Sequence, residues 1–123
     1  MNRHWNHLQT VAQAEIEAIL SSLPVALREP ARALPVSYEA RPGRQLIDEG
    51  IDEDVLGLFV GADFTEPTGS LLPPQIILYL ENIWDFAEAH EDIYRDEVRT
   101  TYLHELGHYL GLGEGDLEER GLE

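Results

Sequence analysis

Apolar residues recur at helical spacing in two long segments of the chain. In residues 4–22 the apolar positions lie three or four apart, and they are Trp5, Leu8, Ala12, Ile16, Ile19 and Leu20. In residues 91–110 they lie four apart, and they are Tyr94, Val98, Tyr102, Leu106 and Leu110. Such spacing places apolar side chains on one face of a helix. Both segments are therefore predicted to be amphipathic helices that pack this face on a core.

Three shorter apolar segments predict β-strands. Residues 36–40 alternate between apolar and polar side chains, whereas 55–60 and 75–80 are almost continuously apolar. Two prolines precede the last segment, and because proline donates no ladder hydrogen bond they favour an edge position or a strand start. Gly57, inside the middle strand, is expected to mark a bulge or the close approach of another backbone.

Glycine and proline divide the rest of the chain into short connecting elements. We expect helical turns at 24–34 and 44–50, a loop at 61–74, a short helix at 82–90 and a last turn at 117–122. No repeat or low-complexity segment is present. A length of 123 residues fits one domain, so residues 1–123 are predicted to form a single one.

Composition limits the class of partner. The chain has no cysteine, which removes disulfides and thiolate metal ligands. No apolar run approaches the roughly 20 residues of a membrane helix, and a cytoplasmic location is expected. Eight basic residues against 24 acidic ones give a net charge of −16, which argues against a nucleic-acid groove. The acidic surface is expected to be solubilising, with a cleft that attracts cationic peptides as the alternative.

The helix predicted at 91–110 ends in a run that can bind a metal ion, H-E-x-x-H-x-x-G-x-x-E, at residues 104–114. His104 and His108 are four apart, so a helix points both imidazoles at one small volume, as a tetrahedral zinc ion requires. In H-E-x-x-H enzymes the glutamate, here Glu105, accepts a proton from the attacking water. The alternative is that the motif occurs by chance, or is an evolutionary remnant, and binds no metal.

The third metal ligand is predicted to follow the helix, because a residue continuing along it could not curl around the ion. Gly111 supplies the break, since glycine adopts left-handed dihedrals without steric strain. Glu114 then occupies the position of the third ligand in H-E-x-x-H-x-x-G-x-x-H sites. Asp116 is the alternative ligand, but it also fits the N-cap of the last helical turn, with Glu119 completing a capping box.

These motifs resemble those of the minimal zincin-like metallopeptidases, small bacterial proteins of about this length. The resemblance rests on the run at 104–114, on the strand at 56–61 and on the proline-led strand at 74–80, and it covers nearly the whole chain. It implies an α+β fold in which a small mixed sheet packs against the N-terminal helix and the metal-binding helix. It also implies that a peptide substrate lies antiparallel along an exposed edge strand, here the one from Gln75 to Leu80.

The resemblance further implies a zinc site of His104, His108 and a downstream acid, with Glu105 as general base of a peptidase. A metal-stabilised peptide-binding module with little turnover is the alternative function. The run differs from the metzincin motif in having glutamate at 114. Metzincins also have a methionine turn below the metal, and no methionine follows residue 114 here. The substrate pocket that such a turn helps to form is therefore expected to be shallow, absent or supplied by a partner. Three candidates could stabilise the oxyanion: Tyr79, His90 and Tyr109.

Overall fold

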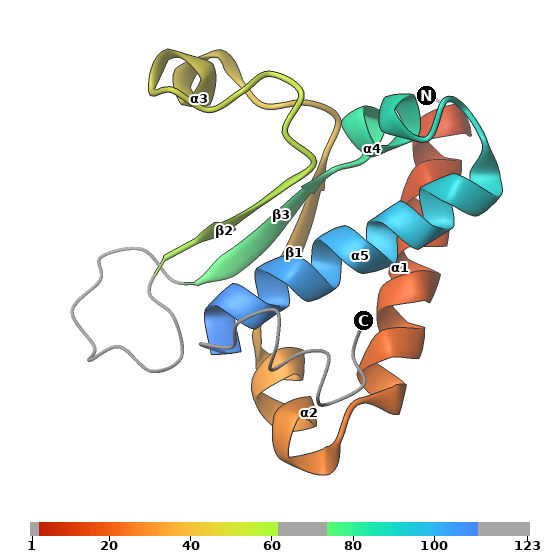
Figure 1. Ribbon diagram of the computed structural model, residues 1–123, viewed down its shortest axis with the longest axis vertical. Coiled ribbons are helices and arrows are strands. Elements are labelled where there is room, and N and C mark those ends of the chain that lie inside the picture. The colour runs from red at the N-terminus through yellow and green to blue at the C-terminus, as the bar shows by residue number, and fades with distance from the viewer. Residues whose placement is uncertain (1–2, 62–73, 111–123) are drawn as a thin grey trace.

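The computed structural model describes residues 3–61 and 74–110, which form an α+β fold with five helices and three strands in this part of the chain (Figure 1). The helices are α1 (Arg3–Ser22), α2 (Val25–Ala33), α3 (Arg44–Asp48), α4 (Leu80–Phe86) and α5 (Glu91–Leu110), and the strands are β1 (Val36–Glu39), β2 (Gly57–Val60) and β3 (Gln75–Tyr79). None of the described helices is apolar enough over a sufficient length to cross a membrane.

The two long amphipathic helices are confirmed almost to the residue as α1 and α5. The turn predicted at 24–34 is a full helix, α2, which contains Pro30. Arg28 of α2 donates hydrogen bonds from Nη2 to the carbonyls of Leu23 (2.9 Å) and Ser21 (3.4 Å). The first of these carbonyls follows the end of α1 and the second lies in its last turn, where backbone carbonyls lack helical donors, so Arg28 joins the two helices.

The strand predicted at the edge of the sheet lies in its centre. The strand order is β1-β3-β2, and β3 pairs parallel with β1 and antiparallel with β2. The prediction that 75–80 is an edge strand is therefore wrong. Pro74 lies immediately before the first paired residue, Gln75, so its missing N–H is not needed in the ladder. Continuous apolar character is also typical of a strand with neighbours on both sides.

Helix α5 lies between the sheet and α1 (Figure 1). Its apolar face fills the core with Tyr94, Val98, Tyr102 and Leu106, none of them more than 1% exposed. The Tyr94 hydroxyl donates to the Leu8 carbonyl of α1 at 2.8 Å, which satisfies a polar group in a buried place. Burial raises the pKa of the Tyr94 and Tyr102 hydroxyls well above the usual tyrosine range.

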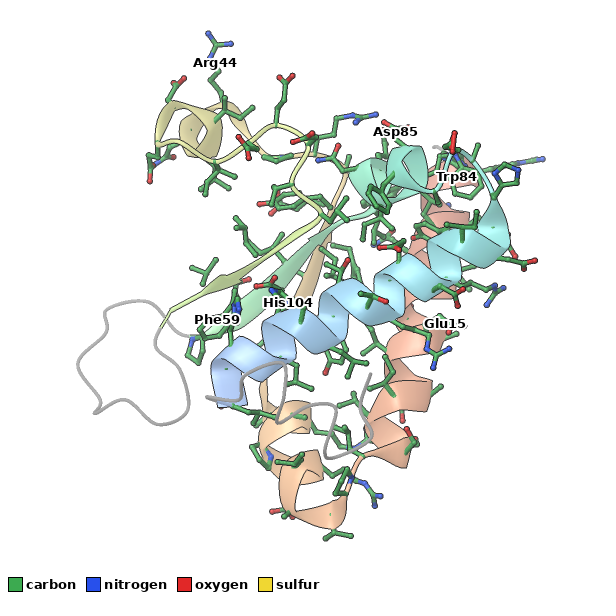
Figure 2. All side chains as sticks on the ribbon, viewed as in Figure 1. Glu15, Arg44, Phe59, Trp84, Asp85 and His104 are labelled. Atoms are coloured by element: carbon green, nitrogen blue, oxygen red, sulfur yellow. The ribbon has the colours of Figure 1, made fainter. Side chains whose placement is uncertain are left out.

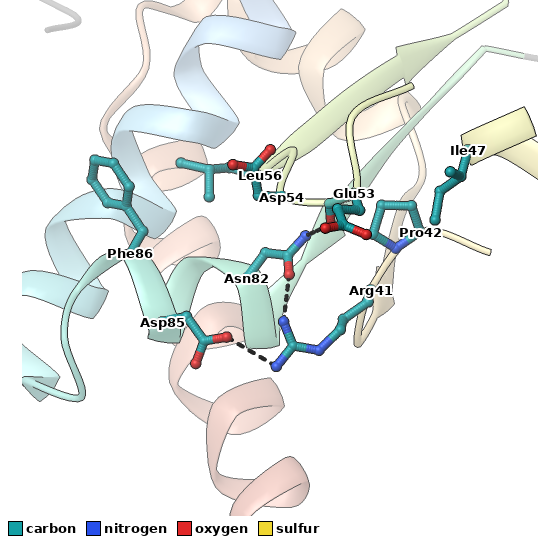
Figure 3. Close-up of a pocket in the computed structure, with 9 residues that line it drawn as sticks. All are labelled: Arg41, Pro42, Ile47, Glu53, Asp54, Leu56, Asn82, Asp85 and Phe86. Atoms are coloured by element: carbon teal, nitrogen blue, oxygen red, sulfur yellow. Dashed lines mark hydrogen bonds and ion pairs between the residues drawn. The ribbon is translucent and has the colours of Figure 1, made fainter. Parts of the chain in front are cut away.

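A buried asparagine holds the loop before β2 against α4 (Figure 3). Asn82, 4% exposed, donates from Nδ2 to the carbonyls of Glu53 (2.9 Å) and Val55 (2.8 Å). Its Oδ1 accepts from Arg41 Nη1 at 2.7 Å, and Arg41 Nη2 also pairs with Asp85 at 2.9 Å. A pocket of about 460 Å³ lies here, and its lining includes Arg41, Glu53, Asn82 and Asp85.

We predict that Asn82→Ala lowers the free energy of unfolding by about 2–3 kcal/mol, because it removes three partly buried hydrogen bonds at once. Denaturant unfolding measures the change, and Asn6→Ala on the exposed side of α1 is the matched control, with an expected effect under about 0.5 kcal/mol. An Asn82 variant as stable as the control would contradict this role.

Candidate metal centre

Two imidazoles lie side by side at the C-terminal end of α5. His104 and His108 are both exposed, and their ring centroids are 4.7 Å apart at an interplanar angle of 63°. The helix is stabilised at its other end by Glu91 and Asp92 in the first turn, where negative charge suits the helix dipole. The histidines therefore stand on a rigid element and share one face, as the four-residue spacing predicts.

Glu105 joins the two histidines. The potential ligand atoms of His104, Glu105 and His108 all lie within 4.8 Å of one another, and His108 Nδ1 is 3.5 Å from Glu105 Oε1. Zinc–nitrogen bonds of 2.0–2.1 Å in a tetrahedron would place two ligand atoms roughly 3.3 Å apart. A bound ion would draw the ligand atoms, which here lie within 4.8 Å of one another, to about that spacing. Two imidazole nitrogens with a carboxylate beside them form a donor set that fits a metal ion.

The Glu105 carboxyl is the buried member of the cluster, with the residue 9% exposed. Burial raises its pKa, and His108, His104 and a hydrogen bond from the Phe59 backbone act in the opposite direction. The Phe59 amide must be the donor, because only a bond to the ionised carboxylate lowers its pKa. The chain thus holds a partly desolvated carboxylate against a strand.

The Phe59 amide belongs to the outer edge of β2. Tyr79 N–H donates to the Leu56 carbonyl at 2.9 Å, which makes these two residues a hydrogen-bonded pair of the antiparallel ladder. Pairs alternate along such a ladder, so the N–H and C=O groups of Gly57 and Phe59 point away from β3. Among the described residues no strand pairs with that side of β2. The Glu105 carboxylate therefore accepts a hydrogen bond from an outward-facing backbone N–H of an edge strand.

Of the three oxyanion candidates, the structure brings only Tyr109 to the cluster. Its ring is 5.8 Å from that of Phe59, one helical turn beyond Glu105. His90 precedes the first residue of α5 and is roughly 20 Å of helix away from His104. Strand alternation places Tyr79 on the face opposite Leu78, whereas Leu78 is the residue that lies next to Gly57 on the α5 side.

The predicted third ligands, Glu114 and Asp116, lie outside the described residues, so their assignment stays a prediction. The pocket lined by Asn82 and Asp85 is not at the metal centre: Figure 2 places Asp85 on α4, well away from His104 and Phe59. The role of Phe59 could not be predicted from the sequence, because a backbone amide leaves no side-chain signal. Only the position of β2 relative to α5 reveals it.

Comparison with known proteins agrees with this geometry. The sequence profile of the family described as zincin-like metallopeptidase matches residues 31–122, three-quarters of the chain. The chain belongs to the zincin-like metallopeptidase family. The match includes all three strands and the whole of α5, so it covers the elements that form the zincin-like metal centre.

A curated protein also resembles part of this zincin-like chain. It is named imidazolonepropionase, from Deinococcus deserti, and is 35% identical over 75 residues. Those residues are 61% of this chain but 18% of that protein. The chain thus spans less than a fifth of its curated relative, and the relative's name describes a much longer protein.

Proposed function

We propose that the protein is a zinc-dependent metallopeptidase that hydrolyses peptide bonds with Glu105 as general base. One observation carries the proposal: two imidazoles and a partly buried carboxylate lie within 4.8 Å of one another beside the outer edge of a strand. Membership of the zincin-like family supports a peptidase over other metal-dependent hydrolases. The absence of cysteine fits a cytoplasmic protein.

In this proposal His104 and His108 hold the ion, with Glu114 as third ligand and Asp116 as its alternative. When bound, zinc supplies a water molecule of lowered pKa and polarises the substrate carbonyl. The Glu105 carboxylate accepts the proton of the attacking water and passes it to the leaving amine. Its raised pKa brings proton uptake closer to neutral pH, as a general base requires. The Phe59 amide keeps the carboxylate facing the histidines.

We place the peptide on β2 in place of β3, whose two sides are both paired. The groups of Gly57 that point away from β3, together with the Phe59 carbonyl, offer a donor and acceptors to an extended peptide. A peptide added antiparallel to β2 would pass the side of the strand where Glu105 binds the Phe59 amide. The net charge of −16 favours cationic peptides.

The test is cleavage of a mixed peptide library by purified protein loaded with zinc. We expect cleavage that is lost on chelation and restored by stoichiometric zinc, with the cut sites read by mass spectrometry. Other divalent metals added to the stripped protein show whether zinc is the active ion. Peptide binding without cleavage would contradict the proposal and support a metal-stabilised binding module. Protein that takes up no metal would overturn both.

A further inference from the structure

Helix α5 meets β2 through one stripe of side chains spaced four residues apart. The members are Thr101, Glu105 and Tyr109, which are 8%, 9% and 8% exposed. Each contacts the strand: Thr101 lies against Gly57, Glu105 accepts from the Phe59 amide, and Tyr109 packs on the Phe59 ring at 5.8 Å. The carboxylate is therefore the middle one of three successive contacts between helix and strand.

The contacts of Gly57 with Thr101 and of Phe59 with Glu105 have matching spacings along the strand and the helix. From Gly57 to Phe59 the strand advances about 6.6 Å, which is two residues of rise. From Thr101 to Glu105 the helix advances about 6 Å, which is four residues of rise. Strand β2 and helix α5 run in the same direction here. When Gly57 and Thr101 are in contact, Glu105 therefore lies level with the Phe59 amide.

The first contact is close because residue 57 has no side chain. A Cβ atom at Gly57 would lie 2.7 Å from Thr101 Cγ2, 3.2 Å from the Ile77 carbonyl oxygen and 3.2 Å from Leu78 Cδ2. Carbon atoms in contact are normally about 3.5–4.0 Å apart. A side chain at 57 would therefore separate β2 from α5 by close to 1 Å. A hydrogen bond of ordinary length, about 2.9–3.0 Å, does not survive such a shift.

We propose that Gly57 and Thr101 are positioning residues, whose close contact sets the distance at which Glu105 binds the Phe59 amide and faces the two histidines. The role of Glu105 as general base rests on the proposed function, whereas its position relative to Phe59 does not. The contact also gives a physical reason for the glycine inside an otherwise apolar strand.

The experiment compares Gly57→Ala, Thr101→Ser and the double variant. Thr101→Ser removes Cγ2, the atom nearest to the new Cβ, and keeps the hydroxyl. Gly43→Ala is the matched control, since a Cβ there has nothing within 4 Å and no positive φ to oppose it. Amide exchange and the amide proton shift of Phe59, measured by NMR on metal-free protein, report the contact without any catalysis. Zinc affinity and peptide cleavage are measured on the same samples.

We expect Gly57→Ala to speed exchange of the Phe59 amide at least about 10-fold. It should lower kcat by about 10–100-fold with little change in zinc affinity, because the base is displaced and the metal ligands are not. Gly43→Ala should resemble the wild type. Thr101→Ser loses the contacting Cγ2 but introduces no clash, so its Phe59 exchange rate and kcat should lie between those of the wild type and Gly57→Ala. The double variant should recover exchange and kcat to within about threefold of the wild type.

An unchanged Phe59 amide in Gly57→Ala overturns the proposal, and so does a double variant no better than the single one. Should Gly57→Ala fail to fold, the rescue is measured as folding by circular dichroism. A double variant that also stays unfolded then overturns the proposal. If no protein in the set cleaves peptides, the proposed function fails, and the NMR data still decide whether Gly57 and Thr101 position Glu105.

Discussion

Replacing either His104 or His108 with alanine should weaken zinc binding by more than about 100-fold, because partners that only support a metal ligand are already worth about 10–100-fold. Both side chains are exposed, so the metal-free variants should melt at the wild-type temperature. The two readouts, zinc titration and thermal unfolding with and without zinc, therefore separate a lost ligand from a damaged fold.

The loss should also appear in the stabilisation that zinc provides. At a free zinc concentration 1,000 times the dissociation constant, binding stabilises the native state by about 4 kcal/mol. A 100-fold weaker variant at the same concentration would retain about 1.4 kcal/mol. For the wild type, affinity should fall as the pH is lowered, since protons compete with zinc for the imidazole nitrogens.

His90→Ala is the matched control for this prediction, because His90 is an exposed histidine at the other end of α5. It should keep the zinc affinity and the zinc-dependent melting temperature of the wild type. Full zinc occupancy in both the His104 and the His108 variants would contradict this site and mean that the motif itself binds no metal.

Replacing Glu105 with glutamine should reduce peptide hydrolysis by about 10²–10⁴-fold while zinc stays bound. The amide has nearly the same shape and still accepts a hydrogen bond from Phe59, but it cannot accept the proton of the attacking water. Asp96→Asn, on the exposed side of the same helix, should leave the rate unchanged. Activity that persists in a clean Glu105→Gln preparation would contradict the assignment of the base.

The same variant should have a distinct pH dependence of stability. Burial raises the pKa of the Glu105 carboxyl, so the folded state binds this proton more tightly than the unfolded state. The contribution of Glu105 to the stability of the metal-free wild type is therefore lost as the pH rises from about 4 through that raised pKa. Glutamine does not ionise, so metal-free Glu105→Gln should be more stable than the wild type at pH 7. The difference should vanish near pH 4, which urea unfolding at the two pH values measures.

The amino-acid sequence determined the features that depend on local spacing. Apolar positions three or four residues apart predicted α1 and α5, and the four-residue spacing of His104 and His108 placed both on one face, since helical geometry acts within a few residues. The apolar segments of β1, β2 and β3 could be located, because burial on a sheet requires them. The motif in α5 then indicated a metal site and its base.

The tertiary structure alone decided which strand is exposed. The pairing of β3 with β1 and β2 depends on contacts between residues up to about 40 positions apart. The amino-acid sequence of a single strand does not specify which strands pair with it. The prolines before β3 fit a strand start as well as an edge, so the sequence could not choose. The same long-range packing brought Gly57 to Thr101 and the Phe59 amide to Glu105. A backbone donor acquires a role only when another element folds against it, so this part of the site was invisible before the fold was known.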